Sequence, residues 1–139
     1  MKALVINLDG SLERMAFQRN QLNKLNIDFT RLSAVLMTND RDKIYQKHYA
    51  NWERPLSLSE VACFFSHKKA WETVIKENQP KLILEDDAYL SDNVPCVLEE
   101  LEKLYNVDYV TMEVTGTKKK KTIAKKKTKT IGDTSLILH

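Results

Sequence analysis

The stretch Lys81-Leu-Ile-Leu-Glu85-Asp86-Asp87 places three apolar residues directly before three consecutive carboxylates. A short apolar run that ends at a turn is typical of a buried, parallel strand. The carboxylates would then lie at the carboxyl end of the strand, where open α/β sheets bind ligands. Adjacent negative charges repel one another unless a cation or hydrogen-bond donors offset them. Oxygen ligands without His or Cys nearby suit Mg²⁺ or Mn²⁺, although a solvated acidic loop explains this stretch alone equally well.

The first third of the chain predicts a β-α-β unit. Residues 3–8 form an apolar run that indicates a buried strand. Ser11 can cap a helix that begins at Leu12, and Asn26 ends it. Residues 27–35 alternate well enough for a second strand. The length of this unit favours parallel pairing, so we expect an α/β domain with a mostly parallel sheet flanked by helices.

The middle of the chain predicts one long helix. Ser57 and Glu60 have the spacing of a capping box, which places the helix start near Leu58. We expect this helix to reach about Glu77, where Asn78-Gln-Pro80 stops it before the acidic strand. Glu60 would be occupied by capping. A shorter helix is expected over residues 40–50.

The last third of the chain predicts a helix followed by two strands. Ser91 or Asp92 is expected to cap the helix, and apolar residues recur on one of its faces. Strands are expected over residues 107–114 and 134–139. Between them lies a basic loop, residues 116–130.

The length of 139 residues indicates one domain over residues 1–139. An apolar content of 42% and a charged content of 29% are ordinary for a globular protein. No stretch approaches the ~20 apolar residues of a membrane span, and the first apolar run is too short for a signal peptide, which predicts a cytoplasmic protein. Cys63 and Cys96 lack metal-type spacing, and we expect buried free thiols.

The positive charge is concentrated in one tract. Eight of the 22 Lys and Arg lie in Lys118–Lys129, and the remaining balance is 14 minus 19, or −5. The tract can be interpreted as a solvated loop, as a contact for anionic lipid or phosphorylated sugar, or as an unspecific cationic segment. Because no aromatic residue interleaves with the lysines, a nucleic-acid partner is not expected.

Three blocks in a fixed order resemble the glycosyltransferase family 25 proteins, which make bacterial lipooligosaccharide and have relatives that galactosylate collagen. One change from the common family pattern is Ala62, where Gly usually precedes the cysteine. The blocks are Val5-Ile-Asn-Leu-Asp9 with Ser11, Glu13 and Arg14; Leu58-Ser-Glu60-Val-Ala-Cys63-Phe-Phe-Ser66-His67-Lys-Lys-Ala-Trp71; and Leu84-Glu85-Asp86-Asp87. The resemblance implies a GT-A-like, Rossmann-like domain that binds a nucleotide diphosphate sugar. It also implies that segments completing the fold and the acceptor site would follow His139.

The first block has a physical interpretation of its own. Asn7 and Asp9 lie where the first strand meets the following helix, a place suited to a nucleotide. Arg14, one turn into that helix, is positioned to contact a diphosphate. An ordinary strand-to-helix turn with a solvated arginine is the alternative.

The second block places Cys63 and His67 on one face of the long helix, with Ser66 on a neighbouring face. Ser66 and His67 are expected near the nucleotide sugar. His67 can hydrogen-bond the sugar or nucleotide, or hold a loop in place, and it is a weak candidate for catalysis. Trp71 is expected to pack in the core.

The third block resembles the Asp-X-Asp motif, in which a metal bridges the donor diphosphate and acts as a Lewis acid. Alternation along an extended segment would place Glu85 and Asp87 on one side and Asp86 on the other. Asp87 is therefore the first choice for an Mn²⁺ or Mg²⁺ ligand. Glu85 or Asp86 would contact the ribose or complete the metal shell.

The resemblance implies transfer of a hexose, such as galactose, from a nucleotide diphosphate sugar to a lipooligosaccharide or LPS saccharide. The implied setting is the cytoplasm of a Gram-negative bacterium. Peripheral contact with its anionic inner membrane is the lipid-contact interpretation of Lys118–Lys129, beside the two other interpretations given above. Two alternatives stay open: a truncated, inactive nucleotide-binding fragment, and a metal-dependent hydrolase or phosphotransferase. No residue is identified as the catalytic base.

Overall fold

The computed structural model describes residues 1–50, 52–104, 107–112, 130–131, 134–135 and 137–138. The chain divides into two compact units, Met1–Asp92 and Asn93–His139, and each is described by itself. The prediction of one domain over residues 1–139 stays a prediction.

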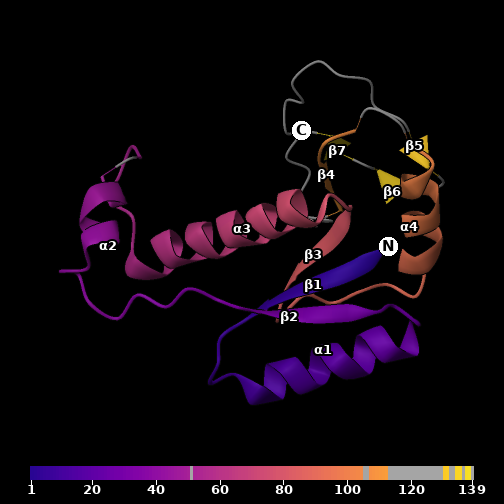
Figure 1. Ribbon diagram of the computed structural model, residues 1–139, viewed down its shortest axis with the longest axis horizontal. Helices are drawn as coiled ribbons and strands as arrows, with labels where there is room; N and C mark the ends of the chain where they lie inside the picture. The colour runs from indigo at the N-terminus through magenta and orange to yellow at the C-terminus, as the bar shows by residue number, and fades with distance from the viewer. Residues whose placement is uncertain (51, 105–106, 113–129, 132–133, 136, 139) are drawn as a thin grey trace. The chain divides into compact units, whose positions relative to one another are not determined.

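A three-stranded parallel sheet forms the centre of the first unit (Figure 1). Its strands are β1 (Lys2–Asn7), β2 (Phe29–Ser33) and β3 (Lys81–Glu85), in the order β2-β1-β3. In the register Val5 lies beside Arg31 of β2 and Leu84 of β3. All three strands therefore point the same way, and their carboxyl ends meet at one edge. The predicted α/β class with parallel pairing is confirmed.

Two helices flank this sheet. Figure 1 shows α1 (Leu12–Lys24) on one side of the sheet and α3 (Leu58–Glu77) on the other. Side chains alternate between the faces of a strand, so β1 can be buried on both. Leu4 and Ile6 of β1 pack with the fully buried Ala70 of α3. Ala3 and Val5 are fully buried as well.

Polar residues mark the ends of the two long helices. Ser57 and Glu60 form the predicted capping box at the start of α3, in which each side chain accepts from the other residue's backbone N–H. Asn26 and Asn78 both have positive φ, 53° and 49°, just beyond α1 and at the end of α3. Asn tolerates this left-handed conformation better than most residues. Ser11 occupies the N-cap position of α1, but its side chain makes no capping hydrogen bond.

A second apolar cluster lies beside the amino end of α3. The short helix α2 (Lys43–His48) begins where Asp42 accepts from the backbone N–H groups of Ile44 and Tyr45. Met37, Val61 and Ala62 are the buried members of the cluster. The segment after β2 is thereby packed against α3.

The second unit contains α4 (Val94–Glu102) and short strands. The prediction of Ser91 or Asp92 as the cap of α4 is wrong, because Asn93 occupies the N-cap position and Pro95 lies in the first turn. Strand β4 (Val110–Thr111) pairs antiparallel with β7 (Ile137–Leu138), and β5 (Thr130–Ile131) pairs antiparallel with β6 (Thr134–Ser135). Residues 107–109 precede β4, so the predicted strand begins later than expected. Residues 113–129, and with them the predictions for Lys118–Lys129, lie outside the described part.

Three side chains are more exposed than the sequence predicts. Cys63 and Cys96 are free thiols, as expected, but both are exposed. Trp71 is 41% exposed instead of packing in the core. For Cys63 and Trp71 the prediction of burial was wrong because a 20-residue helix with apolar residues on several faces presents only one of them to the sheet. Cys96 lies on α4, where Val94 and Leu98 are the buried residues.

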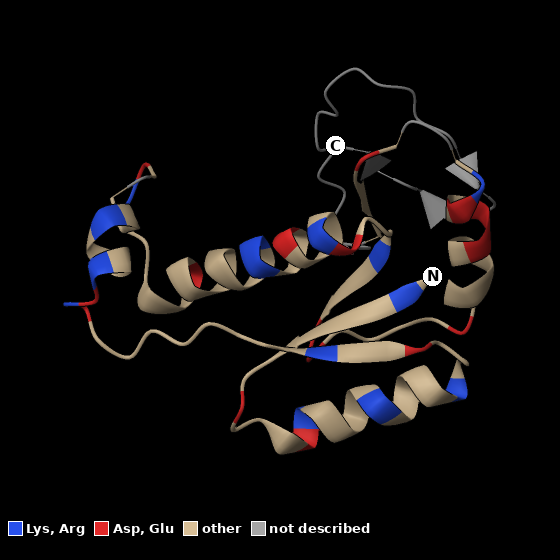
Figure 2. Ribbon diagram, viewed as in Figure 1, with Lys and Arg blue, Asp and Glu red and all other residues tan. Residues whose placement is uncertain are grey.

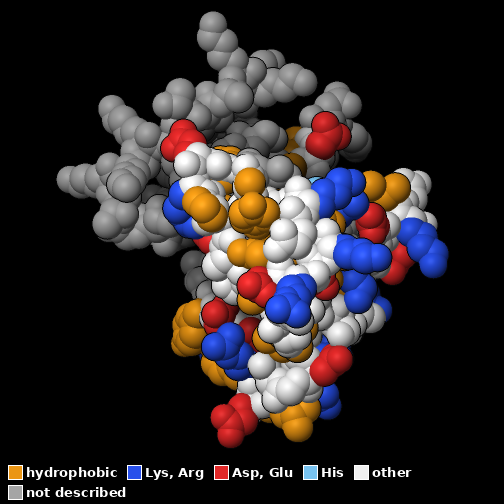
Figure 3. Space-filling view, turned by 90° about the vertical axis from the view of Figure 1, so that its left-hand side faces the viewer, with side chains coloured by type: hydrophobic (Ala, Val, Ile, Leu, Met, Phe, Trp, Pro, Cys, Tyr) orange, Lys and Arg blue, Asp and Glu red, His pale blue; other side chains and the backbone are white. Residues whose placement is uncertain are grey.

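Charged residues of both signs occur over the first unit. Figure 2 shows acidic and basic positions interleaved along α3, whereas α1 carries one acidic position at its start and basic positions along the rest. Figure 3 shows charges of both signs on one face. None of the helices in the described ranges is both long and apolar enough to cross a membrane.

Candidate functional site

A cavity of about 540 Å³ opens beside the carboxyl ends of the parallel strands. Apolar side chains form much of its wall, and a polar group lies at the strand ends. The apolar lining includes Ile6, Leu8, Leu36, Met37, Leu58 and Ala62; the polar lining includes Cys63, Ser66, His67, Glu85 and Asp86. Four residues predicted for the nucleotide-sugar site, Ser66, His67, Glu85 and Asp86, therefore line one cavity. Asn7, Asp9, Arg14 and Asp87 are not among its lining residues.

Asp86 is the buried member of the acidic triplet, with 8% of its surface exposed. Its carboxylate accepts from Asn7 Nδ2 at 2.7 Å and from Arg14 Nη1 at 3.1 Å. Burial of a carboxylate is costly unless hydrogen bonds or an opposite charge offset it. The contacts with Asn7 and Arg14 supply both, so Asp86 ties β1 and α1 to the turn after β3.

The side-chain amide of Asn7 is fully engaged in hydrogen bonds of this network. Asn7 is 2% exposed. Its amide nitrogen also donates to the carbonyl of Ser11 at 3.0 Å, and its Oδ1 accepts from Arg31 Nε at 2.7 Å. With its amide engaged on both sides, Asn7 acts here by holding Asp86 in place.

Asp87 is the exposed neighbour of Asp86 and lies at the margin of the same network. Arg14 Nη1 lies 3.7 Å from Asp87 Oδ2, and the side chains of Asp87 and Arg14 are 63% and 59% exposed. The strand ends at Glu85, and Asp86 and Asp87 lie in a turn. The predicted alternation therefore does not continue past Glu85, and Asp87 shares its cationic neighbour with Asp86.

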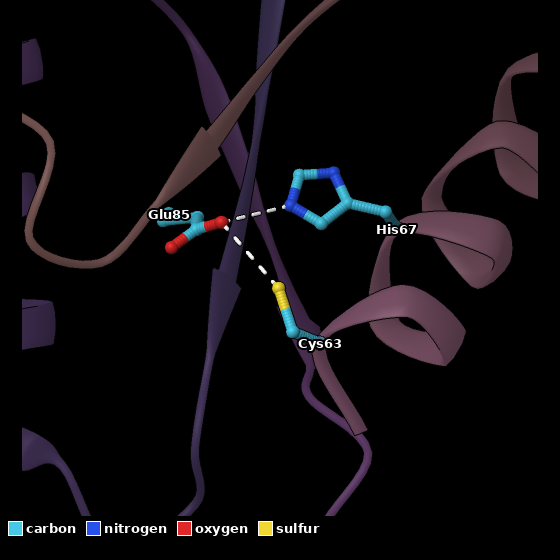
Figure 4. Close-up of side chains that lie close together, drawn as sticks. All are labelled: Cys63, His67 and Glu85. Atoms are coloured by element: carbon cyan, nitrogen blue, oxygen red, sulfur yellow. Dashed lines mark hydrogen bonds and ion pairs between the residues drawn. The ribbon is translucent and has the colours of Figure 1, made fainter. Parts of the chain in front are cut away.

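Glu85 belongs to a third environment, formed with α3 (Figure 4). Its Oε1 lies 2.9 Å from His67 Nε2 and 3.7 Å from Cys63 Sγ. Partial desolvation raises the pKa of the Cys63 thiol, and the neighbouring Glu85 carboxylate raises it further. The prediction of an oxygen-only neighbourhood is wrong for Glu85, because the fold brings a thiol and an imidazole to it.

Asp9 lies at the end of β1 and turns toward β2. It accepts hydrogen bonds from Arg31 and from Ser33 Oγ, the latter at 2.8 Å. These hydrogen bonds, led by that of Arg31, lower the pKa of Asp9. The carboxylate is 77% exposed, so it remains open to a ligand on its other side.

Ser66 is buried and fixes one wall of the cavity. Its hydroxyl accepts from the backbone N–H of Val35 and donates to the carbonyl of Ala62. The segment that follows β2 is thereby attached to α3. Ser66 thus shapes the cavity that it lines.

Three residues that hold the site were not predicted. Gln18 is fully buried and donates to the carbonyls of Asp86 and Ala88, while Gln21 donates to Ala88 and accepts from Leu90 N–H. The spacing of Met15, Gln18 and Leu22 places Gln18 on the buried face of α1, which is the sequence signal for a satisfied buried amide. Arg31, which joins Asn7 to Asp9, gives no such signal in the sequence.

Among the three carboxylates of the acidic triplet, the donor set fits a hard divalent cation best at Asp87. The Asp86 carboxylate is bonded to Asn7 and Arg14, and Glu85 faces the thiol and imidazole. Asp87 is 63% exposed, and its contact with Arg14, at 3.7 Å, is looser than those of Asp86. Mg²⁺ and Mn²⁺ sites often use one or two carboxylates and take the remaining ligands from substrate phosphates, which is compatible with one available carboxylate.

The parallel sheet with its cavity and acidic edge defines a Rossmann-like α/β protein of the GT-A-like type. The family model described as "Glycosyltransferase family 25 (LPS biosynthesis protein)" matches residues 1–135. The chain belongs to glycosyltransferase family 25, which confirms the resemblance carried by the three blocks.

Two curated relatives are similar to this chain, and each is named "Glycosyltransferase 25 family member". The one from Aedes aegypti is 28% identical over 120 residues, which cover 76% of this chain and 20% of the relative. The one from Anopheles gambiae is 32% identical over 93 residues, which cover 60% of this chain and 16% of the relative. The chain spans a fifth or less of the length of these relatives.

Proposed function

We propose that this chain is the donor-binding part of a glycosyltransferase that moves a hexose from a nucleotide diphosphate sugar to a saccharide acceptor. The observation that carries the proposal is the cavity at the carboxyl edge of the parallel sheet, lined by Ser66, His67, Glu85 and Asp86. Open α/β sheets bind their ligands at this edge. Membership of glycosyltransferase family 25 supports the same reaction class.

The described residues suit the two halves of such a donor. The apolar wall of the cavity suits the nucleoside, with polar groups at one end to orient it. Arg14 has a half-exposed side chain at the acidic edge, and its planar guanidinium suits a diphosphate. Asp9 and Glu85 are the exposed carboxylates that we assign to sugar or ribose hydroxyls.

Asp87 is the residue that would hold Mn²⁺ or Mg²⁺. When bound, such an ion would offset charge on the leaving nucleotide diphosphate as a Lewis acid. The chain's own part is to keep Asp87 exposed while Asn7 and Arg14 hold the adjoining Asp86. No base for the acceptor hydroxyl is assigned.

The acceptor is proposed to be a lipooligosaccharide or LPS saccharide, following the description of the family model. Galactose is the first donor sugar to test. Contact with an anionic membrane through Lys118–Lys129, and a cytoplasmic location, stay predictions.

The test combines binding with transfer. Calorimetric titration of nucleoside diphosphates with Mn²⁺ measures donor binding, and radiolabelled nucleotide sugars with saccharide acceptors measure transfer. Asp87→Asn should abolish metal-dependent transfer. Asp28→Asn removes a charge just before β2, at the opposite edge of the sheet, and should leave transfer unchanged.

Each of the other possible results favours a different alternative to the proposed function. Transfer that survives Asp87→Asn would contradict the metal assignment. Nucleotide binding without transfer would favour the nucleotide-binding fragment, and phosphate release without an acceptor product would favour a hydrolase.

A further inference from the structure

Three side chains of different chemistry converge at one end of the cavity. Cys63 and His67 lie four residues apart, one turn along α3, and Glu85 is the last residue of β3. One ligand atom from each side chain lies within 4.8 Å of the other two. Figure 4 shows the thiol and the imidazole both turned toward the Glu85 carboxylate.

We propose that Cys63, His67 and Glu85 form a binding site for a divalent ion of the Zn²⁺ class. A sulfur, a nitrogen and an oxygen donor suit Zn²⁺ or Co²⁺, whereas Mg²⁺ and Mn²⁺ favour oxygen ligands. This site is distinct from the hard-cation site proposed at Asp87. It does not rest on the proposed transferase function.

The spacing of the donors is compatible with four-coordinate geometry. With Zn–S near 2.3 Å and Zn–N or Zn–O near 2.0–2.1 Å, a tetrahedron places its donor atoms roughly 3.3–3.6 Å apart. The observed separations are 2.9 Å from His67 to Glu85 and 3.7 Å from Cys63 to Glu85. Shifts of a few tenths of an ångström would bring both of these separations into range. The Cys63 and His67 donors lie within 4.8 Å of each other, and side-chain rotation would have to bring them closer.

The charges of the donors also balance. A thiolate and a carboxylate carry two negative charges, which a divalent ion neutralises, and the imidazole is neutral. On binding, the Cys63 thiol loses its proton to solvent, and His67 ligates the ion through an unprotonated Nε2. Ion binding is therefore accompanied by proton release.

Three protein ligands leave the fourth position of a tetrahedral ion open. Structural zinc sites are usually closed by four protein ligands, whereas sites with three admit water or a ligand. All three side chains also line the cavity. The open position would therefore accept water or an oxygen atom of a molecule held there.

The experiment is a titration of the metal-free full chain with Co²⁺ as a spectroscopic probe. The expected result is binding of one Co²⁺, with visible bands of a four-coordinate ion and a thiolate-to-cobalt charge-transfer band. Zn²⁺ should displace the probe, and Mn²⁺ at the same concentration should not. Circular dichroism of each variant checks that it is folded.

Matched variants locate the site. Cys63→Ser should remove the charge-transfer band and weaken Co²⁺ binding by at least about tenfold, since even indirect ligand changes cost that much. Cys96→Ser removes the other exposed thiol and should leave the spectrum unchanged. His67→Gln and Glu85→Gln should each weaken binding, whereas His48→Gln should not.

The proposal is overturned if folded chain gives no charge-transfer band, or if the band survives Cys63→Ser. Loss of the band in Cys96→Ser, or equal displacement by Mn²⁺, would also overturn it. None of these readouts uses a nucleotide or measures transfer, so failure here is distinguishable from failure of the proposed function.

Discussion

Asp86 and Asp87 show how differently the fold uses two identical neighbouring residues. Asp86 is buried and bonded to Asn7 and Arg14, while the Asp87 side chain is 63% exposed. The sequence predicts that a carboxylate triplet follows a strand. It does not predict which carboxylate is buried, because the partners of Asp86 lie 79 and 72 residues earlier in the chain.

We predict that Asp86→Ala lowers the free energy of unfolding by about 2–3 kcal/mol. Hydrogen bonds to charged groups contribute about 1.5–3 kcal/mol, and the substitution leaves the buried Asn7 amide without one of its acceptors. Urea unfolding followed by circular dichroism measures the change. Asp87→Ala is the matched control and should stay within about 0.5 kcal/mol of the parent chain. Equal losses in the two variants would contradict a structural role for Asp86.

The bounds of helices and strands were predicted well where capping or turn residues in the sequence mark their ends. Helix α3 begins and ends where the Ser57-Glu60 capping box and Asn78 predict, and β3 ends at Glu85. The start of α4 was predicted wrongly because Ser91, Asp92 and Asn93 are all good N-cap residues in a row. The burial of Cys63 and Trp71 was also wrong, since which face of α3 meets the sheet depends on tertiary packing.

The stabilisation that Glu60 provides at the start of α3 should depend on pH. Hydrogen bonds from Arg54, and then from Ser57, lower the pKa of Glu60 from 4.5 to about 2. Because the folded-state pKa is the lower one, the unfolded chain binds the proton more tightly. The stabilisation by Glu60 should therefore be complete above about pH 5 and be lost as the pH falls toward 2.

Melting temperatures at pH 7 and pH 3 test this prediction. Glu60→Gln should melt below the parent chain at pH 7, and the difference should shrink at pH 3. Glu72→Gln removes the same charge from the same helix away from its start, and should change the melting temperature less at pH 7. A Glu60→Gln deficit of the same size at both pH values would rule out a contribution from the ionised carboxylate.

At the scale of the whole molecule, the β-α-β pattern predicted the parallel sheet. The three sequence blocks predicted the family. What the sequence did not predict is the contact between the β3 edge and α3, because the approach of Cys63 and His67 to Glu85 depends on how the helix packs on the sheet. Patterns along the chain specify elements, whereas the site depends on contacts between elements.

Nucleotide binding should stabilise the first unit as a whole. A ligand that binds only the folded state at 100 times its dissociation constant adds about 2.7 kcal/mol to the stability. We therefore expect a higher melting temperature with a nucleoside diphosphate and Mn²⁺, measured by calorimetry. The matching nucleoside without phosphates lacks the groups proposed to meet Arg14 and should give a smaller shift. Equal shifts would contradict a diphosphate site at Arg14 and Asp87.

The central strand β1 precedes both of its neighbours in the chain, and this has a consequence for protein synthesis. Asn7 cannot meet Asp86 until a further 79 residues have been translated. At about 5–20 residues per second, this delay is roughly 4–16 seconds. During that interval the apolar residues Ala3 to Ile6 lack their β3 partner. The ribosome-bound chain should therefore be a substrate for chaperones that recognise exposed apolar segments, until β3 has emerged.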